Sequence, residues 1–561
     1  GLSSVVINKH IYSSSMDARP SNLHWGIYRG DLSTNEVGVN LGGRDIVAQT
    51  SNNAVYYQVQ AYTHRWVGVD FTPTVPNTTI NYAGNPGKYL MFYPTPGNIK
   101  FENKDIITNT KGKVRFIGSE NAGAWIASYV PDRRTFISGT TKPQIIDFGK
   151  VELIGDKNVA YYFADSPIAI KSSARGGASA NGVFEGEVNV NVEMGKSLDG
   201  ATGSTQIGTG NMAGGDSTKS EKNVAIYVAS GQRNEMNEIR DSFAQFYPAT
   251  LSFTIDNINL YGTDDMHRIV GITNGDDIGA HQLGTNANII AKVHNLQLKD
   301  FNIVFGKYSQ DSIGIVAKNG SVIDLEPISG KVTDNAENGA EKNVLVYAEG
   351  VWWNPRFALT AATYDKEAYG RGESVTGQKY ISDFNTKVNI KKNVEMGSIK
   401  STAFFAKSGA IIDSTNNTVK MTGYGSTAVL AHSTSDYATG KIVDSYNANA
   451  NVQPKTEIIV KSVEALAQDS AGTTDGDKNT NIAVAAISEE KIGGITNKGT
   501  GNVTVTVKEN VKVKGLGAFA SGEKAIVKIE SANDKSDITS GANGALVATN
   551  AGTIDFGGGT I

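Results

Sequence analysis

Short runs of alternating apolar and polar residues recur along most of the chain, and each run ends at a glycine. One copy covers residues 114–118, and an alanine-rich apolar run follows it at 124–127. Alternation with a period of two predicts a β-strand with one buried face, and glycine permits a sharp turn after it. The first run returns at 151–155, 258–262, 419–423 and 511–515, and alanine runs return at 160–164, 428–431 and 518–520. Internal repetition of this kind predicts a repeat architecture, on which any site must lie.

A third short strand follows the alanine run in several copies. Residues 403–406 lead through Gly409 to 411–413, and two further copies pass through Gly320 to 322–324 and through Gly552 to 554–556. Three short strands per repeat, separated by glycines, predict an all-β fold, namely a right-handed parallel β-helix with three strands per coil. The closest copies are spaced as Gly397 is from Gly423 and as Ala518 is from Ala545, which sets the expected length of one coil.

The repeat divides the chain into two regions. Residues 1–105 lack it and are rich in Trp and Tyr, so they form either a cap that seals the β-helix or a binding tip, and both interpretations remain open. Residues 106–561 are the predicted β-helix. Insertions are expected near 196–220, 232–250 and 351–374, the first a Gly/Ser/Thr-rich loop and the other two short helices. Related Lys-Asn-Val segments at 157–159, 222–224 and 342–344 place the two helical insertions after equivalent strands.

Composition excludes several classes of function. The formal net charge of −4 over 561 residues, without a block of like charge, leaves no electrostatic footprint for nucleic acid. The chain has no cysteine, so it forms neither disulfides nor thiolate metal sites. No histidine pair has metal-binding helical spacing and no phosphate-binding loop occurs, so we expect no metal and no cofactor. No apolar stretch is long enough to span a bilayer, residue 1 opens no signal segment, and the glycine-rich end resembles a cut between repeats.

Two acidic clusters bear on an enzymatic function. Asp264 and Asp265 lie near His267, and Asp276 and Asp277 lie near His281. Paired carboxylates can activate water for glycoside hydrolysis or bind calcium. Asp264 and Asp265 occupy the polar turn that follows Gly262 in the repeat, and the second cluster follows Asn274-Gly275, another turn signal. Ordinary turns are therefore favoured, and we predict no catalytic residue.

Aromatic residues that interrupt the repeat are the better candidates for binding. The last insertion contains Trp352, Trp353, Arg356 and Tyr364. Two adjacent tryptophans in an extended chain point to opposite faces, so they are not expected to be core residues together. Trp and Arg are enriched at binding hot spots, and an aromatic ring also suits a sugar. An equal alternative is that Trp352 anchors its own insertion. In the N-terminal region the candidates are Trp25, Tyr28 and Trp66.

Segments 314–320, 495–499 and 545–554 resemble the passenger repeats of type V autotransporters. They are most similar to those of the very large fusobacterial outer-membrane adhesins of the galactose-inhibitable and arginine-inhibitable types. The resemblance covers residues 106–561 and concerns scaffold repeats, so it transfers no binding residue. It implies an extracellular passenger domain of type V secretion, anchored in the outer membrane by a barrel that this chain lacks.

The function expected from this resemblance is that of a monomeric adhesin. It would bind a host-cell receptor protein or glycan, or partner bacteria in coaggregation, and contribute to virulence. The alternatives are a β-helical enzyme that processes polysaccharides and a spacer that binds nothing.

Overall fold

Parallel β-strands make up most of the structure, which is a computed structural model. It describes every residue of 340–350, 386–434, 455–499, 501–541 and 544–561. Before residue 340 it describes the residues in strands and, outside them, Asn121. The chain forms two units, each treated separately below: unit 1 (residues 1–297 and 355–376) and unit 2 (residues 298–354 and 377–561). The prediction of an all-β fold is confirmed for the described residues, where the helices are as short as α5 (Asp475–Lys478) and the 3₁₀ turn η5 (Ala532–Asp534). None of the described helices is long and apolar enough to cross a bilayer.

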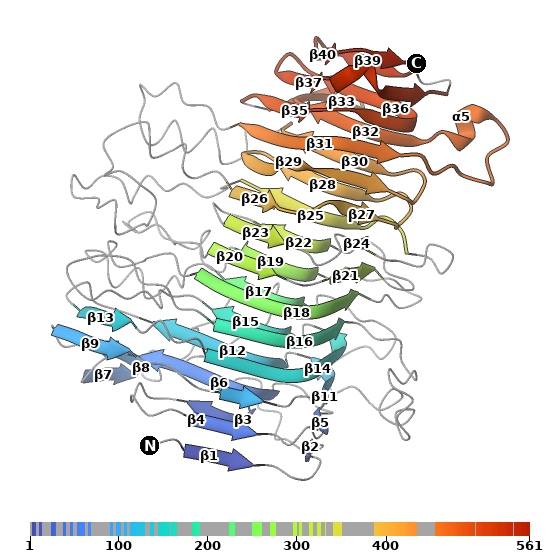
Figure 1. The fold of residues 1–561 in the computed structure, drawn as a ribbon. Helices are drawn as coiled ribbons and strands as arrows, with labels where there is room; N and C mark the ends of the chain where they lie inside the picture. Colours follow the sequence, from blue (N-terminus) through green and yellow to red (C-terminus); the bar gives the residue numbers. More distant parts are fainter. Residues whose placement is uncertain are drawn as a thin grey trace. The chain divides into compact units, whose positions relative to one another are not determined.

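The strands of unit 2 form three rows, in each of which successive strands pair in parallel (Figure 1). The first row contains β22 (Ile313–Ala317), β25 (Val344–Glu349), β28 (Thr402–Lys407), β30 (Thr427–His432), β32 (Asn481–Ile487), the end of β36 (Val511–Ser521) and β39 (Leu546–Thr549). The second contains β23 (Val322–Glu326), β26 (Thr386–Ile390), the start of β29 (Ala410–Met421), the start of β31 (Thr456–Ala465), β35 (Val503–Val507), β37 (Ala525–Ile529) and β40 (Thr553–Phe556). The third contains β24 (Lys331–Val332), β27 (Val394–Met396), the ends of β29 and β31, the start of β36, β38 (Ser536–Thr539) and β41 (Gly559–Thr560). The chain passes from the first row to the second and the third, and then returns to the first.

Unit 1 has its own set of three rows. Its first row contains β3 (His24–Arg29), β6 (Asn53–Ala61), β12 (Ala122–Tyr129), β15 (Val159–Ala164), β17 (Val224–Ala229) and β19 (Val270–Asp276). Its second row contains β1 (Ser3–Val6), β4 (Val37–Asn40), β10 (Ile106–Thr108) and the starts of β14 (Gln144–Asp156), β16 (Gly182–Val190) and β18 (Thr250–Leu260). Its third row contains β2 (Ile11–Ser13), β5 (Asp45–Ala48), β11 (Lys113–Ser119) and the ends of β14, β16 and β18.

Strands of the first 61 residues therefore join the rows, although their sequence lacks the repeated pattern. Two further pairs lie apart from the rows of unit 1: antiparallel β7 (Arg65–Gly68) and β8 (Leu90–Tyr93), and parallel β9 (Gly97–Phe101) and β13 (Thr135–Gly139). Whether this region caps the fold or binds a ligand stays a prediction. The expected insertions at 196–220 and 351–374, and 232–250 apart from Thr250, lie outside the described residues.

Columns of identical register positions build the core of unit 2. In the first row the register aligns alanines on seven successive strands, and all but the last are fully buried: Ala317, Ala348, Ala406, Ala431, Ala486, Ala520 and Ala548. Beside them runs a buried column of larger residues, which includes Val346, Phe404, Val429 and Val484. Small and large columns side by side fill the interior at close packing, which explains the recurrent alanines.

Some strand limits differ from the expected ones. Gly515 does not interrupt β36, because its φ of 144° bends the chain while pairing continues on both sides. β29 and β31 likewise each run from the second row into the third row, so each contains the last strand of one predicted repeat and the first strand of the next. Ala518 pairs with Leu546 instead of Ala545, whose carbonyl accepts hydrogen bonds from the amides of Gly517 and Ala518. Asn274 to Asp276 continue β19 through a register shift, so they do not form the expected turn.

A column of buried polar residues begins at Asn343, in the Lys-Asn-Val segment of unit 2. The amide of Asn343 donates to Ser401 Oγ, the amide of Ser401 donates to Ser426 Oγ, and the amide of Ser426 donates to Asn481 Oδ1. All four residues are buried, and each stands at the start of a first-row strand or directly before it. The side chain of each strand's leading residue thus satisfies an amide of the preceding strand, which pins the register.

A column of alternating charge runs along the third row of unit 2. The register aligns Lys331, Glu395, Lys420, Glu464, Lys512 and Asp537 on successive strands. Neighbouring strands lie about 4.8 Å apart, so each charge within the column has opposite charges on both sides, and like charges are about 10 Å apart. The column thereby avoids the repulsion that stacking identical residues would produce.

Candidate binding surface

The outer face of the first row in unit 2 carries aromatic residues within reach of solvent. Phe404 and Ala406 are buried, whereas Phe405 and Lys407, which alternate with them along β28, are only half-buried. Phe405 aligns with Tyr347 and Leu430. Its ring lies 5.3 Å from that of Tyr347 and 6.3 Å, edge-on, from that of His432. These contacts across strands hold the rings in one strip.

A polar group borders this strip at the end of the strands. Lys407 Nζ lies 4.0 Å from Glu349 Oε1, and His432 Nε2 lies 3.6 Å from Glu490 Oε2. Burial lowers the pKa of His432 below its ordinary value, and this effect outweighs the opposing one of Glu490. His432 is therefore neutral at neutral pH, and its buried Nδ1 has no hydrogen-bond partner in the described part of the chain.

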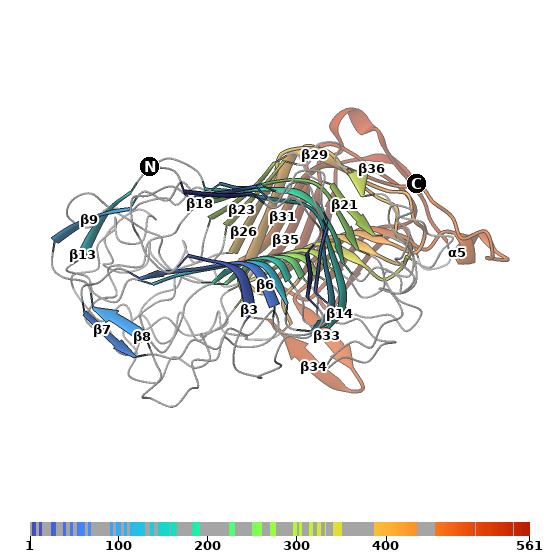
Figure 2. The same cartoon turned by 90° about the horizontal axis from the view of Figure 1, so that it is seen from below.

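Beside this group a β-hairpin projects from the rows (Figure 2). It consists of β33 (Glu489–Ile492) and β34 (Ile495–Lys498), joined by Gly493 and Gly494 with φ of 58° and 81°. Positive φ at both central residues gives a type I′ turn, whose twist suits a two-residue hairpin. Ile492 and Ile495 flank the turn and are 57% and 66% exposed. The segment 495–499, which the sequence predicts to be part of the repeat, is thus mainly a hairpin arm and not a strand of the three rows.

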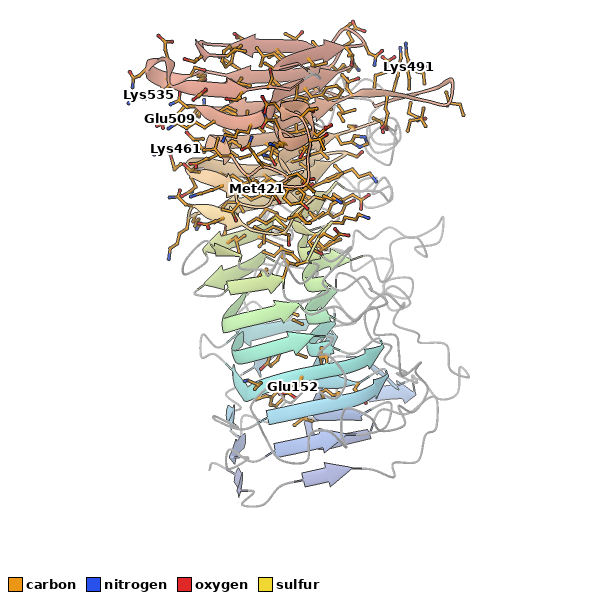
Figure 3. All side chains as sticks on the ribbon, turned by 90° about the vertical axis from the view of Figure 1, so that its right-hand side faces the viewer. Glu152, Met421, Lys461, Lys491, Glu509 and Lys535 are labelled. Carbon is orange, nitrogen blue, oxygen red and sulfur yellow. The ribbon has the colours of Figure 1, made fainter. Side chains whose placement is uncertain are left out.

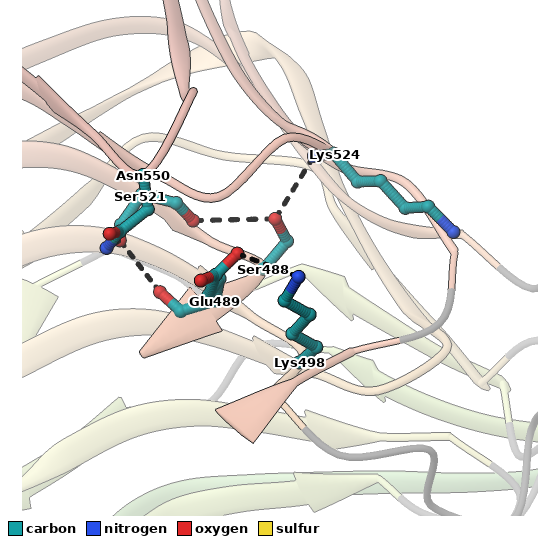
Figure 4. Close-up of polar contacts among 6 residues, drawn as sticks. All are labelled: Ser488, Glu489, Lys498, Ser521, Lys524 and Asn550. Atoms are coloured by element: carbon teal, nitrogen blue, oxygen red, sulfur yellow. Dashed lines mark hydrogen bonds and ion pairs between the residues drawn. The ribbon is translucent and has the colours of Figure 1, made fainter. Parts of the chain in front are cut away.

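Polar contacts fix the base of the hairpin (Figure 4). Ser521 Oγ donates to the Glu489 carbonyl at 2.7 Å and accepts from Asn550 Nδ2 at 3.0 Å, while Ser488 Oγ accepts from the Lys524 amide at 3.2 Å. Lys498 Nζ lies 3.7 Å from Glu489 Oε2, across the two arms. The hairpin is therefore held in one orientation, which keeps the entropic cost of binding through it low.

Charged groups of unit 2 lie on more than one side of it. In the described residues no three His, Asp or Glu side chains gather into a metal site. The hairpin carries Lys491 on one side of unit 2, and Lys461, Glu509 and Lys535 lie on the opposite side (Figure 3). Aromatic rings, both signs of charge and an exposed apolar tip therefore lie near one another at the hairpin.

No protein-family model, curated protein or solved structure matches the chain. The surface is consequently interpreted from its own chemistry.

The predicted binding residues are only partly placed by the structure. Trp352, Trp353, Arg356 and Tyr364 lie outside the described residues. Trp25 and Tyr28 belong to β3, in the first row of unit 1, and Trp66 belongs to β7, where it pairs with Phe92; only the backbone is described at these three positions. Their role in binding stays a prediction.

The residues of the acidic clusters are placed in the same partial way. Asp276 ends β19, and Asp264, Asp265, His267, Asp277 and His281 lie outside the described residues.

Sequence reasoning missed the aromatic strip of unit 2. Tyr347 and Phe405 alternate with buried residues of the repeat, as Phe405 does with Phe404 and Ala406, so in the sequence they resemble core residues. The available signal was that large residues hold this position in several copies, namely Tyr347, Phe405, Leu430 and Phe519.

Proposed function

We propose that the three rows are the three faces of a right-handed parallel β-helix. The supporting observation is the cyclic order in which the chain visits the rows, always with parallel pairing. Parallel strands linked by crossovers are right-handed in nearly all cases, which supports this hand.

We further propose that the chain is the passenger of a bacterial cell-surface adhesin, exposed outside the cell and attached to the outer membrane in its full-length form. The observation that carries the proposal is the contrast between a repetitive interior and a varied outer surface. Stacked strands with in-register apolar columns make a stiff scaffold, and the fixed hairpin beside the aromatic strip displays non-repeated side chains to one side. The receptor is a glycan or a protein on a host cell or a partner bacterium, and the chain acts without a cofactor.

The test is binding of the purified, labelled chain to host cells and to bacteria. Free galactose, N-acetylgalactosamine and arginine serve as competitors, and the heat-unfolded chain serves as the control. Saturable binding that a competitor or the unlabelled chain reduces supports the adhesin. Loss of binding in a folded Trp352→Ala/Trp353→Ala variant assigns the site to the last insertion, whereas unchanged binding assigns it elsewhere. The absence of saturable binding to any cell contradicts the proposal and favours a spacer.

The second candidate is a polysaccharide-processing enzyme. The observation that favours it is the position of Asp276, a carboxylate residue at the end of a row strand. Release of reducing sugars from polysaccharide that is abolished in Asp276→Asn or Asp277→Asn variants would replace the adhesin proposal.

A further inference from the structure

The alternating charges along the third row of unit 2 point away from the core. Each of the four central charges stands between two buried apolar residues, as Lys420 does between Val419 and Met421 and Lys512 does between Val511 and Val513. Successive side chains of a strand alternate between two faces, so the charges occupy the outer face. We call the series the charge column; it consists of Lys331, Glu395, Lys420, Glu464, Lys512 and Asp537.

The side chains of this column are open to solvent and form no ion pair with a described residue. Lys420, Lys512 and Asp537 are exposed, and Glu395 and Glu464 are half-buried. None of these five forms an ion pair within 4.0 Å in the part of the chain that the structure describes. Where the strands pass from the second row to the third, other charges do pair: Lys461 Nζ lies 4.0 Å from Glu509 Oε1, and Lys508 Nζ lies 3.6 Å from Glu530 Oε1. The charges of the column are therefore available to a partner.

The order of the charges makes the column complementary to a second copy of itself. Six successive strands carry strictly alternating charges, so the series begins with a lysine and ends with an aspartate. A two-fold axis parallel to the strands would bring two copies face to face with their stacks running in opposite directions. Lys420 of one copy then lies opposite Glu464 of the other, Glu395 lies opposite Lys512, and the register brings Lys331 opposite Asp537. Because both copies have the same strand spacing of about 4.8 Å, all six pairs match together.

The neighbouring positions on this face are compatible with such a pair. The register aligns Thr418 with Ser462 on one side of the column and Lys514 with Thr539 on the other. Of these four residues only Lys514 is charged, and the same axis brings it opposite Gly397, so it meets no like charge. A shift of one copy by one strand would place like charges opposite one another, so the charges also define the register of the two copies.

We propose that the charge column is the contact surface of a homodimer, in which two copies of the chain pair antiparallel along the third row of unit 2. A polyanion or a polycation carries one sign of charge and would be repelled at every second position, whereas a second copy has the matching alternation and spacing. Exposed ion pairs each contribute little and one column is narrow, so we expect a weak dimer with a Kd of about 0.1–1 mM at low salt. This inference departs from the monomer expected from the sequence, and it does not depend on the proposed adhesin function.

The first experiment treats the purified chain with a carbodiimide, which joins a lysine amine to a carboxylate that it contacts. Within one copy Glu395 and Lys512 are three strands apart, about 14 Å, so the reagent cannot join them inside a chain. We expect a Glu395–Lys512 link in the dimer, and mixed ¹⁴N- and ¹⁵N-labelled chains should give linked peptides that contain both isotopes. The link should be lost at about 0.5 M salt, where the Debye length is about 4 Å.

Charge reversals at the centre of the column provide the second experiment, read by sedimentation equilibrium. Lys420→Glu and Glu464→Lys each create two like-charge contacts in the dimer and should weaken it at least about tenfold. An equimolar mixture of the two variants should associate again, because each supplies the charge that the other lacks. The control is Lys528→Glu, which makes the same change in charge on a strand of the second row and should leave association unchanged.

A chain that stays monomeric up to millimolar concentration at low salt would overturn the proposal. So would a dimer that lacks the Glu395–Lys512 link, a dimer insensitive to both charge reversals, or a mixture of folded variants that does not associate. The cross-link requires no variant, so it decides the question even where a charge reversal impairs folding. Binding of a monomer to cells would leave the adhesin proposal intact, and a dimer that binds no cell would leave this inference intact.

Discussion

Asn481 connects three strands of unit 2, and its replacement by alanine should loosen the rows around it. The two N–H groups of its Nδ2 face three carbonyls, those of Ala467 at 2.6 Å, Lys514 at 3.1 Å and Ala465 at 3.2 Å, so one N–H is shared between two of them. Its Oδ1 accepts from the amide of Ser426 at 3.3 Å. One side chain thereby holds the end of β31, the loop that follows it, the preceding strand of the first row and the next repeat.

The expected cost follows from the groups left without a partner. Asn481→Ala leaves the buried amide of Ser426 and the carbonyl of Ala467 without this partner, and each orphaned backbone group costs about 1–3 kcal/mol. The variant should therefore be destabilised by about 2–6 kcal/mol. Asn481→Asp has the same shape but places a carboxylate oxygen against three carbonyls, so at neutral pH it should be at least as damaging.

Hydrogen exchange is the suitable assay, because repeat proteins open locally and a single unfolding free energy does not describe them. The amides of Ser426 and Ile482 should exchange about 30-fold faster or more in Asn481→Ala, and the guanidinium midpoint of unit 2 should fall. Asn497→Ala, in the hairpin, is the control and should change stability by less than about 0.5 kcal/mol. Unchanged protection of Ser426 in a folded Asn481→Ala protein would refute the view that this polar column secures the register.

Three other predictions concern backbone, titration and charge. Gly515→Ala should lower the free energy of unfolding by about 3 kcal/mol or more in thermal melts, because Gly515 has a φ of 144° and a Cβ there would overlap the carbonyl of Asn481. Gly493→Ala should lower it by only about 1–2 kcal/mol, because Gly493 has a φ of 58° and open space around it, and equal costs would contradict this reasoning. Stability should decrease as pH falls below about 6.5, because burial holds the pKa of His432 below its value in the unfolded chain, so the unfolded state binds the proton first. His432→Gln should reduce this pH dependence in melting curves, and identical pH profiles of variant and wild type would count against the prediction. Lys420→Glu creates three successive acidic positions in the third row and should cost about 0.5–1 kcal/mol at low salt, less at high salt and less in Lys420→Gln, and a cost independent of salt would argue against the charge column.

Repetition in the sequence was sufficient to predict many strands of the rows. The runs at 114–118, 160–164 and 428–431 fall in β11, β15 and β30, because a period of two and flanking glycines report local backbone geometry. The strands of residues 3–61 were not predicted, since their aromatic residues obscure the same alternation. Pairing in the rows depends on neighbours that are distant in sequence, which no local pattern contains.

The candidate surfaces show the same division. The hairpin carries an obvious turn signal in Gly493 and Gly494, yet the exposure of Ile492 and Ile495 follows from the direction in which the rows project it. The expected binding residues were sought where the repeat is interrupted. The aromatic strip lies within the repeat instead, at a position that only the register reveals.

The sequence by itself determined that this protein is built from short strands and glycine turns, that it forms neither disulfides nor thiolate metal sites, and that its repeats stack. These properties are set by each residue's own chemistry and by spacing along the chain. The tertiary structure alone decided which residues share a column, as in the columns of six alternating charges and seven alanines. Columns form between strands that are tens of residues apart, and a shift of one residue would move every side chain to the other face, so only the actual pairing defines the surface that a ligand meets.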